Sequence, residues 1–202
     1  MFLPDREALA TVLPEGGRHV STLAIGGFVN HRKPITLIQT LAHLAPNLRP
    51  TSLVILSASL DLDLALAAWP SIRTVHCPFT GIEGHATVSP FFRARYATGE
   101  LEVPAWDTGL LARALATDPD TEVATTTGLG TDLPALNPWL TVREAAVWVR
   151  GLAVDLALLH LPRATSDGRA LWPDSPWADA LLWDRADQVI ASMPQQALWS
   201  DP

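Results

Sequence analysis

Apolar residues along the chain fall into short runs separated by amphipathic segments, a pattern that predicts alternating strands and helices. Apolar runs of about four to eight residues are typical of strands buried on both faces. Such runs lie at His19–Ile25, Thr51–Ala58, Ile72–Cys77, Glu100–Trp106, Val154–Leu161 and Asp187–Met193. Helical patterns with start or stop signals lie at Pro34–Leu44, Asp61–Trp69, Ser89–Gly99 and Asp107–Ala116. This order predicts an α/β fold with a mixed, mainly parallel sheet flanked by helices.

Two stretches depart from the alternation. Ala164–Trp172 predicts a turn or hairpin built on Asp167 and Gly168. Thr117–Trp139 is the least regular part of the chain and is predicted to be surface loop. The length of 202 residues suits one large domain or two small ones, and we expect a single domain over residues 1–202.

Composition and charge narrow the class of protein. The chain has a formal net charge of −7, from 21 acidic and 14 basic residues, which disfavours nucleic acid as a partner. Its apolar runs are shorter than the roughly 20 residues of a membrane span, and "MFLPDREALA" lacks the pattern of a signal peptide. We therefore expect a cytoplasmic protein. The single cysteine, Cys77, excludes an internal disulfide or a cysteine-based metal cluster, and is more typical of a buried small residue than of a nucleophile.

The stretch "AIGGFVNHRKP" follows the first predicted strand and precedes a helix that starts with proline. In open parallel sheets, ligands bind beyond the carboxyl ends of strands. The adjacent Gly26 and Gly27 allow a ligand close to the backbone, and His31, Arg32 and Lys33, the only lysine in the chain, supply donors. Adjacent glycines also occur in plain tight turns, but the cationic residues favour a ligand-binding loop. The stretch matches neither a dinucleotide fingerprint nor a Walker A loop.

Two further glycine-containing loops carry candidate polar groups. "GLGTDLP" has the features of a backbone nest with Thr131 and Asp132 on its rim, although a loop capped by Asp132 is the favoured interpretation of this stretch taken alone. "GIEGHA" places Glu83 and His85 after a strand, where they are either acid–base groups or solvated loop residues. The sequence contains no G-x-S-x-G, H-E-x-x-H or paired Cys/His spacing, so no metal site is predicted.

The motifs taken in order resemble those of a known family. "IGGFVNHRKPITLIQTLA", "SLVILSAS", "GIEGHATVSPFFRARYATGELEV", "GLGTDL" and "DLALLHLPRATSDGRAL" together resemble the alpha subunit of family I CoA-transferases, and of glutaconate CoA-transferase in particular. The resemblance implies a CoA-transferase (NagB/RpiA-like) fold and a homologous beta subunit, in a heterodimer or heterotetramer. It also implies acyl-CoA and a carboxylic acid as substrates, with coenzyme A thioester as substrate and no permanently bound cofactor. The nucleophile of such enzymes is a glutamate of the beta subunit.

The resemblance also implies roles for residues of this chain. The backbone of Gly26 and Gly27 would stabilise the developing oxyanion and is the predicted catalytic element. The predicted substrate-binding residues are Phe28, Asn30, His31, Arg32, Glu83, Gly130 and Thr131. Lys33 is not predicted to be catalytic, because a lysine at a helix start has a structural explanation.

Three features leave other functions open. Thr108 stands where several relatives, including CoA-ester hydrolases, have glutamate. The chain is shorter at its C-terminus than typical alpha subunits, and some members of the family hydrolyse or decarboxylate CoA esters. Six of the eight tryptophans lie in the last third, as in a protein interface or a packed core: Trp139, Trp148, Trp172, Trp177, Trp183 and Trp199. The alternatives are therefore a CoA-ester hydrolase, a decarboxylating lyase, or a non-catalytic assembly subunit.

Overall fold

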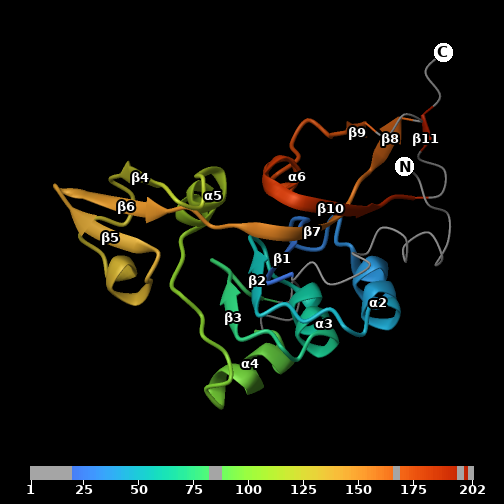
Figure 1. Cartoon of the computed structure of the whole chain (residues 1–202), viewed down its shortest axis with the longest axis horizontal. Helices are drawn as coiled ribbons and strands as arrows, with labels where there is room; N and C mark the ends of the chain where they lie inside the picture. Colours follow the sequence, from blue (N-terminus) through green and yellow to red (C-terminus); the bar gives the residue numbers. More distant parts are fainter. Residues whose placement is uncertain (1–19, 82–87, 166–168, 195–197, 200–202) are drawn as a thin grey trace.

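A computed structural model describes residues 20–81, 88–165, 169–194 and 198–199. Its central element is a five-stranded sheet with the order β10-β7-β1-β2-β3, in which every neighbouring pair is parallel. The strands are β1 (Thr22–Ile25), β2 (Ser52–Ile55), β3 (Thr74–His76), β7 (Val154–His160) and β10 (Ala186–Ser192). The predicted mainly parallel sheet is confirmed (Figure 1).

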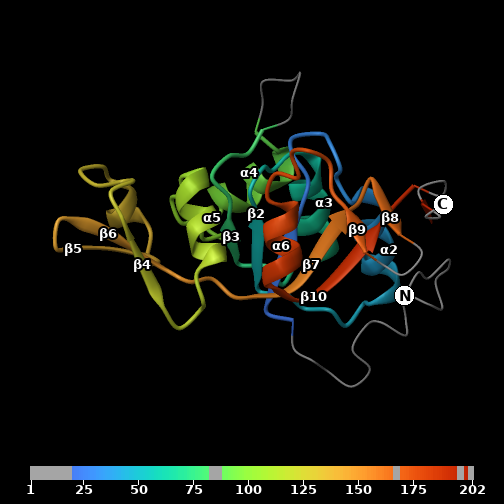
Figure 2. The same cartoon turned by 90° about the horizontal axis from the view of Figure 1, so that it is seen from above.

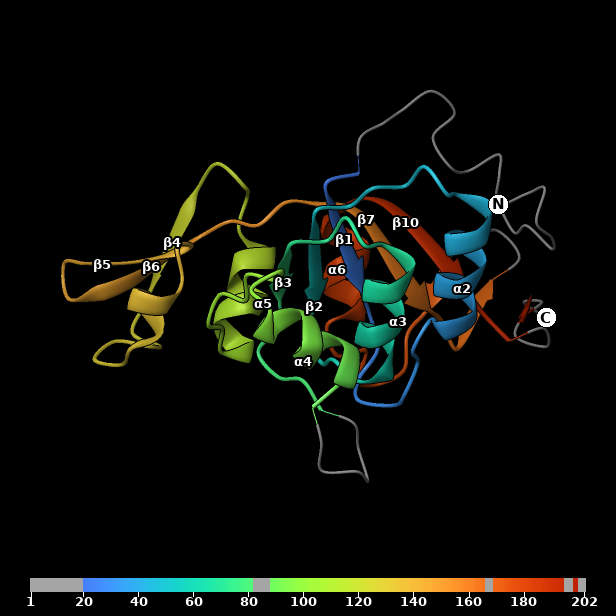
Figure 3. The same ribbon diagram turned by 90° about the horizontal axis from the view of Figure 1, so that it is seen from below.

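Helices cover both faces of this sheet, because alternate side chains of each strand point to opposite sides. In β1, Leu23 and Ile25 join one buried cluster and Ala24 the other. The first cluster includes α2 (Ile35–Leu44) and α3 (Leu60–Ala68), which lie in front of the sheet with α4 (Pro90–Ala97) in Figure 3. The second includes α5 (Thr108–Ala116) and α6 (Asp179–Arg185), and α6 is seen over β7 and β10 in Figure 2. Burial on both faces explains why these strands read as continuous apolar runs.

Two small sheets complete the described part of the chain. An antiparallel sheet contains β4 (Glu122–Thr125), β6 (Ala146–Arg150) and β5 (Leu140–Arg143), and packs on α5 at one end of the molecule (Figure 1). The second contains β8 (Arg163–Thr165), β9 (Ala170–Leu171) and β11 (Leu198–Trp199). Strands β8 and β9 form the predicted hairpin, whose turn residues Asp167 and Gly168 lie outside the described residues.

The structure corrects two predictions. Glu100–Trp106 is not a strand, because Glu102 alone forms a bridge there, to Thr74. The predicted loop Thr117–Trp139 contains β4 and a 3-10 helix, η1 (Leu133–Leu136). The other predicted helices and strands are confirmed, with ends that differ by at most three residues from those predicted. No helix among the described residues is long and apolar enough to span a membrane.

Candidate functional site

The loop Gly26–Lys33 lies at the point where the order of the sheet reverses. From β1 the chain adds β2 and β3 on one side, and then returns to place β7 on the other side of β1. Loops that follow β1 and β7 therefore diverge at the carboxyl edge of the sheet. This topological switch point is where open α/β sheets bind ligands.

Both glycines of this loop are required by close packing. A Cβ on Gly26 would lie 2.5 Å from Leu159 Cδ2 and 2.6 Å from Asp179 Oδ1. Gly27 has φ +91°, and a Cβ there would lie 2.7 Å from the carbonyl oxygen of Arg32. The glycine pair is thus explained by the fold of the loop itself, whether or not a ligand also approaches it.

The first four backbone N–H groups of the loop are already engaged. Gly26 N donates to the carbonyl oxygen of Leu158 at 3.0 Å, and Gly27 N donates to Asp179 Oδ1 at 2.6 Å. Phe28 N donates to the carbonyl oxygen of His31 at 2.9 Å. Val29 N donates to Ser57 Oγ at 3.0 Å. A substrate oxyanion that binds Gly27 N–H must therefore displace the carboxylate of Asp179, so the oxyanion role stays a prediction.

Arg32 is fixed on the same carboxylate. Its Nε donates to Asp179 Oδ2 at 3.0 Å and its Nη2 donates to the carbonyl oxygen of Pro176 at 3.2 Å. Asp179 is fully buried, whereas the side chain of Arg32 is 21% exposed. The segment that precedes α6 is thereby tied to the β1–α2 loop.

Lys33 ties the other end of the loop to the next strand connection. Its Nζ lies 2.6 Å from Asp61 Oδ2 and also donates to the carbonyl oxygen of Ser57. The Lys33 side chain is 6% exposed and that of Asp61 is fully buried. A flexible ammonium with three donors suits this position, between a carboxylate and a carbonyl. The only lysine of the chain is therefore a buried structural group.

Three residues of the loop remain exposed: Phe28, Asn30 and His31. Asn30 Oδ1 accepts a hydrogen bond from Ser59 Oγ at 2.9 Å. The ring of Phe28 packs against Trp177 with centroids 4.7 Å apart. Phe28 and Trp177 are 40% and 41% exposed, so the loop has an aromatic border beside His31. The structure thus brings together Gly26, Gly27, Phe28, Asn30, His31 and Arg32 among the predicted site residues.

Two of the other predicted residues, Gly130 and Thr131, lie away from this loop. Gly130 and Thr131 lie between β4 and η1, beside the small antiparallel sheet that Figures 1 and 2 show at the opposite end of the molecule from α2. Thr131 Oγ1 donates to the carbonyl oxygen of Gly128 at 2.7 Å, which closes that loop on itself. Glu83, together with His85, lies outside the described residues.

Sequence reasoning missed two residues at this edge of the sheet. His160 ends β7, and its Nδ1 lies 3.0 Å from Ser192 Oγ at the end of β10. Burial lowers the pKa of His160 from its ordinary value of 6.5, and the negative charge of Asp179 acts in the opposite direction. Asp179 itself follows an irregular Pro-containing segment, and a lone acidic residue there gives no signal in the sequence.

A second buried histidine lies at the end of β3. His76 is fully buried, accepts a hydrogen bond at Nδ1 from Trp106 Nε1 at 3.1 Å, and meets the Trp139 ring edge to face. Burial lowers its pKa to about 4, so the imidazole is neutral near pH 7. The next residue, Cys77, is buried as predicted, and burial raises the pKa of its thiol to about 12. A thiol in this state is a packing group, because the thiolate is the nucleophile.

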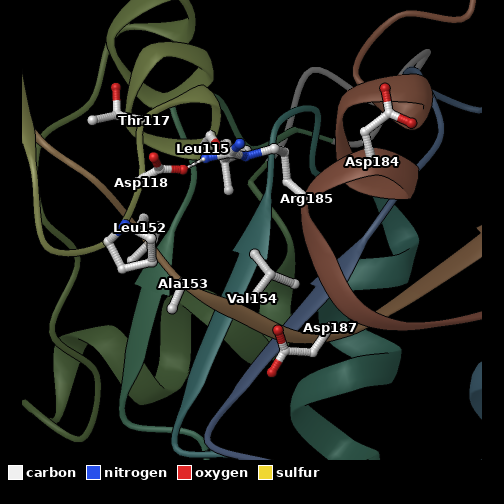
Figure 4. Close-up of a pocket in the computed structure, with 10 residues that line it drawn as sticks. Leu115, Thr117, Asp118, Leu152, Ala153, Val154, Asp184, Arg185 and Asp187 are labelled. Carbon is white, nitrogen blue, oxygen red and sulfur yellow. Dashed lines mark hydrogen bonds and ion pairs between the residues drawn. The ribbon is translucent and has the colours of Figure 1, made fainter.

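No cluster of three metal-ligating side chains occurs within the part of the chain that the structure describes. A shallow hollow of about 250 Å³ lies at the amino ends of β7 and β10, lined in part by Val154, Asp118, Arg185 and Asp187 (Figure 4). There Arg185 Nη2 binds Asp118 Oδ1 at 2.6 Å. Because the strands are parallel, this hollow is at the opposite edge of the sheet from the Gly26–Lys33 loop. It lacks the convergent donors of a ligand site.

Comparison with solved structures finds the same fold in CoA-transferases and in a decarboxylase. A variant of the decarboxylase AibA/AibB superposes with a TM-score of 0.76 at 20% identity, over 98% of this chain and 76% of that chain. Glutaconate coenzyme A-transferase from Acidaminococcus fermentans superposes with a TM-score of 0.70 at 18% identity, over 93% of this chain and 67% of that one. An acyl-CoA transferase of E. coli O157:H7, YdiF, in a thioester complex with CoA, matches with a TM-score of 0.59 at 15% identity. That match spans 97% of this chain and 44% of the other.

Sequence comparison gives the family. No curated protein sequence matches the chain. The profile of the family described as Coenzyme A transferase matches residues 7–178, a range that includes the glycine loop, strands β1, β2, β3 and β7 of the central sheet, and α2 to α5. A match over this much of the chain, together with the shared fold, shows that the chain belongs to the Coenzyme A transferase family.

Proposed function

We propose that the chain is the alpha-type subunit of a heteromeric CoA-transferase and that its Gly26–Lys33 loop is the acyl-CoA side of a shared active site. One observation carries the proposal: the loop exposes the imidazole of His31, the amide of Asn30 and the ring of Phe28, whereas the carboxylate that binds the loop is buried. Asp179 is fully buried and bonded through both oxygens, so it is not available as a nucleophile. We therefore assign the carboxylate that attacks the thioester to a partner subunit.

The chemistry divides between the two subunits. A partner carboxylate attacks the thioester carbonyl, the CoA thiolate leaves, and a mixed anhydride forms. The CoA thiolate then attacks the glutamyl carbonyl of this anhydride and expels the first acid as its carboxylate. The glutamyl–CoA thioester that remains reacts with the second acid. On this chain, His31 and Asn30 are exposed donors beside the reacting carbonyl, and Phe28 packs against the acyl group. Arg32 has two of its nitrogens engaged, so its first role is to hold the loop in place.

A second candidate is a decarboxylating lyase of the same fold. The superposition on the decarboxylase AibA/AibB, with a TM-score of 0.76, is consistent with this alternative. A lyase needs donors at the thioester carbonyl to stabilise an enolate, but it does not need a carboxylate that carries CoA. The same loop suits both reactions, and the partner subunit decides between them.

The test is to purify the chain alone and in complex with a co-expressed homologous beta subunit. Acyl-CoA is then supplied with and without acceptor carboxylates, and CoA transfer, free thiol and released CO2 are measured. We expect transfer from the complex only. Hydroxylamine should trap an acyl-glutamyl or glutamyl–CoA adduct on the partner. Full transfer by the isolated chain would refute the shared site, and CO2 without an adduct would favour the lyase.

Two variants connect the activity to this loop. His31→Ala removes an exposed donor, and we expect it to reduce kcat/KM while the protein stays folded. The matched control is His43→Ala, because His43 lies in the last turn of α2, away from the loop. If the complex is inactive in all three assays and does not bind CoA, the chain is an assembly subunit and the proposal is wrong.

A further inference from the structure

The carboxylate of Asp179 contacts the Gly26–Lys33 loop at more than one point, although the two are far apart in sequence. Asp179 is the first residue of α6, and 152 positions separate it from Gly27. Oδ1 accepts from Gly27 N at 2.6 Å, and Oδ2 accepts from Arg32 Nε at 3.0 Å. The same Oδ1 would lie only 2.6 Å from a Cβ on Gly26. The carboxylate therefore fits at this position because Gly26 has no Cβ and Gly27 donates its N–H.

The loop that Asp179 binds contains two non-glycine residues with positive φ. Val29 has φ +48° and Arg32 has φ +54°, conformations that side-chain-bearing residues adopt rarely. Trp177, which packs on Phe28 from the segment before α6, has φ +56°. Strained residues persist only where surrounding contacts hold them, and they concentrate at functional sites. The carboxylate, at the two ends of the strained turn, provides such contacts.

We propose that Asp179 is a positioning residue of the site: its carboxylate fixes Gly27 and Arg32, and so sets where the loop presents Phe28, Asn30 and His31. This inference rests on the proposed function for its effect on turnover. Asp179 does not touch substrate in this arrangement, because it is fully buried behind the loop. Its charge also reaches His160, which lies at the end of the neighbouring strand β7.

The experiment compares Asp179→Asn with Asp174→Asn, an exposed acid of the same segment, in the complex with the beta subunit. We expect Asp179→Asn to lower kcat about 10- to 100-fold with a smaller change in KM, because a misplacement of about 1 Å costs this much in rate. Asp174→Asn should match the wild type. Arg32→Lys keeps a cation beside Asp179 but loses the Nε geometry, and should show the same split if Asp179→Asn does not fold.

Two spectroscopic readouts test the inference without activity. In Asp179→Asn the amide proton of Gly27 should move upfield, because it loses a charged acceptor, and the pKa of His160 should fall, because it loses a nearby negative charge. Asp174→Asn should change neither signal. Unchanged Gly27 and His160 signals, or altered signals with wild-type kcat and KM, would overturn the positioning role. A wild-type complex without CoA chemistry would instead refute the proposed function, and the two signals would still decide whether Asp179 holds the loop.

Discussion

Replacing Lys33 with methionine tests whether the only lysine of the chain is a buried structural group. Lys33→Met keeps most of the apolar stem but removes the ammonium that binds Asp61 and the carbonyl oxygen of Ser57. Among the described residues, Asp61 would then keep its hydrogen bond from Ser59 N, at 2.8 Å, in a fully buried position. Removal of one partner from a buried ion pair costs about 3–5 kcal/mol, because the remaining charge is uncompensated.

The magnitude is large enough to measure by thermal and chemical unfolding. For a domain of this length, about 1 kcal/mol corresponds to roughly 2–4 °C in Tm, so the expected decrease is about 6–20 °C. Urea unfolding at pH 7 measures the loss in free energy directly. Arg93→Met is the matched control, because Arg93 is exposed on α4 and its loss should stay within about 0.5 kcal/mol.

The double variant Lys33→Met/Asp61→Asn separates the ion pair from simple loss of packing. Its second change removes the unpaired charge while the amide oxygen still accepts from Ser59 N. We expect the double variant to lose less than the sum of the single variants, by about 1–3 kcal/mol. A loss for Lys33→Met no larger than that for Arg93→Met, or additive effects of the two changes, would refute the reasoning.

Three further predictions concern buried groups. Gly26→Ala should lower stability by about 1–3 kcal/mol, because its Cβ overlaps Leu159 and Asp179. Gly109→Ala, whose Cβ would approach Asp107 Oδ1 at 3.1 Å, should cost less, and paired urea titrations of the two variants decide this. The pKa of His76 is about 4 in the folded state and close to its ordinary value of 6.5 in the unfolded state. The contribution of neutral His76 to the free energy of unfolding is therefore fully present above pH 6.5 and is lost as pH falls toward 4, because only the unfolded state binds the proton in this range. Between pH 7.5 and 5 this loss is about 2 kcal/mol, and it should be missing from the pH dependence of His76→Gln; equal slopes for both proteins would contradict it. Cys77, with a pKa of about 12, should react with a disulfide reagent only as fast as the protein unfolds, and rapid labelling of the folded chain would argue against its burial.

The elements that the sequence predicted well are those in which burial dominates the pattern. β1, β2 and β7 are covered on both faces, so their residues are mostly apolar without alternation and their type is clear. The antiparallel sheet of β4, β5 and β6 was not predicted, because β4 and β5 are largely exposed and a partly solvated strand has a weak apolar signal. The Glu100–Trp106 prediction was wrong because extended backbone with apolar residues need not find a ladder partner.

The candidate site shows the same division between local and long-range information. The position of the Gly26–Lys33 loop followed from local signals, namely a strand, two glycines and a proline-started helix. The long-range partner of that loop did not, because Asp179 lies 152 positions from Gly27 and no local pattern contains that contact. The role of Lys33 became clear only when Asp61 and Ser57 were seen around it.

The long sequence separation inside the sheet has a consequence for synthesis on the ribosome. β1 pairs with β7, which begins at Val154, and the Gly27 amide donates to Asp179, which is synthesised later still. Pairings of this range are slow to form, because a large loop must close before any contact stabilises it. While the chain grows, β1 therefore has β2 on one side and an unpaired edge on the other. The nascent protein is exposed to wrong strand pairing until β7 has been made, and the site loop, held early by Ser57 and Asp61, gains its contact with Asp179 only afterwards.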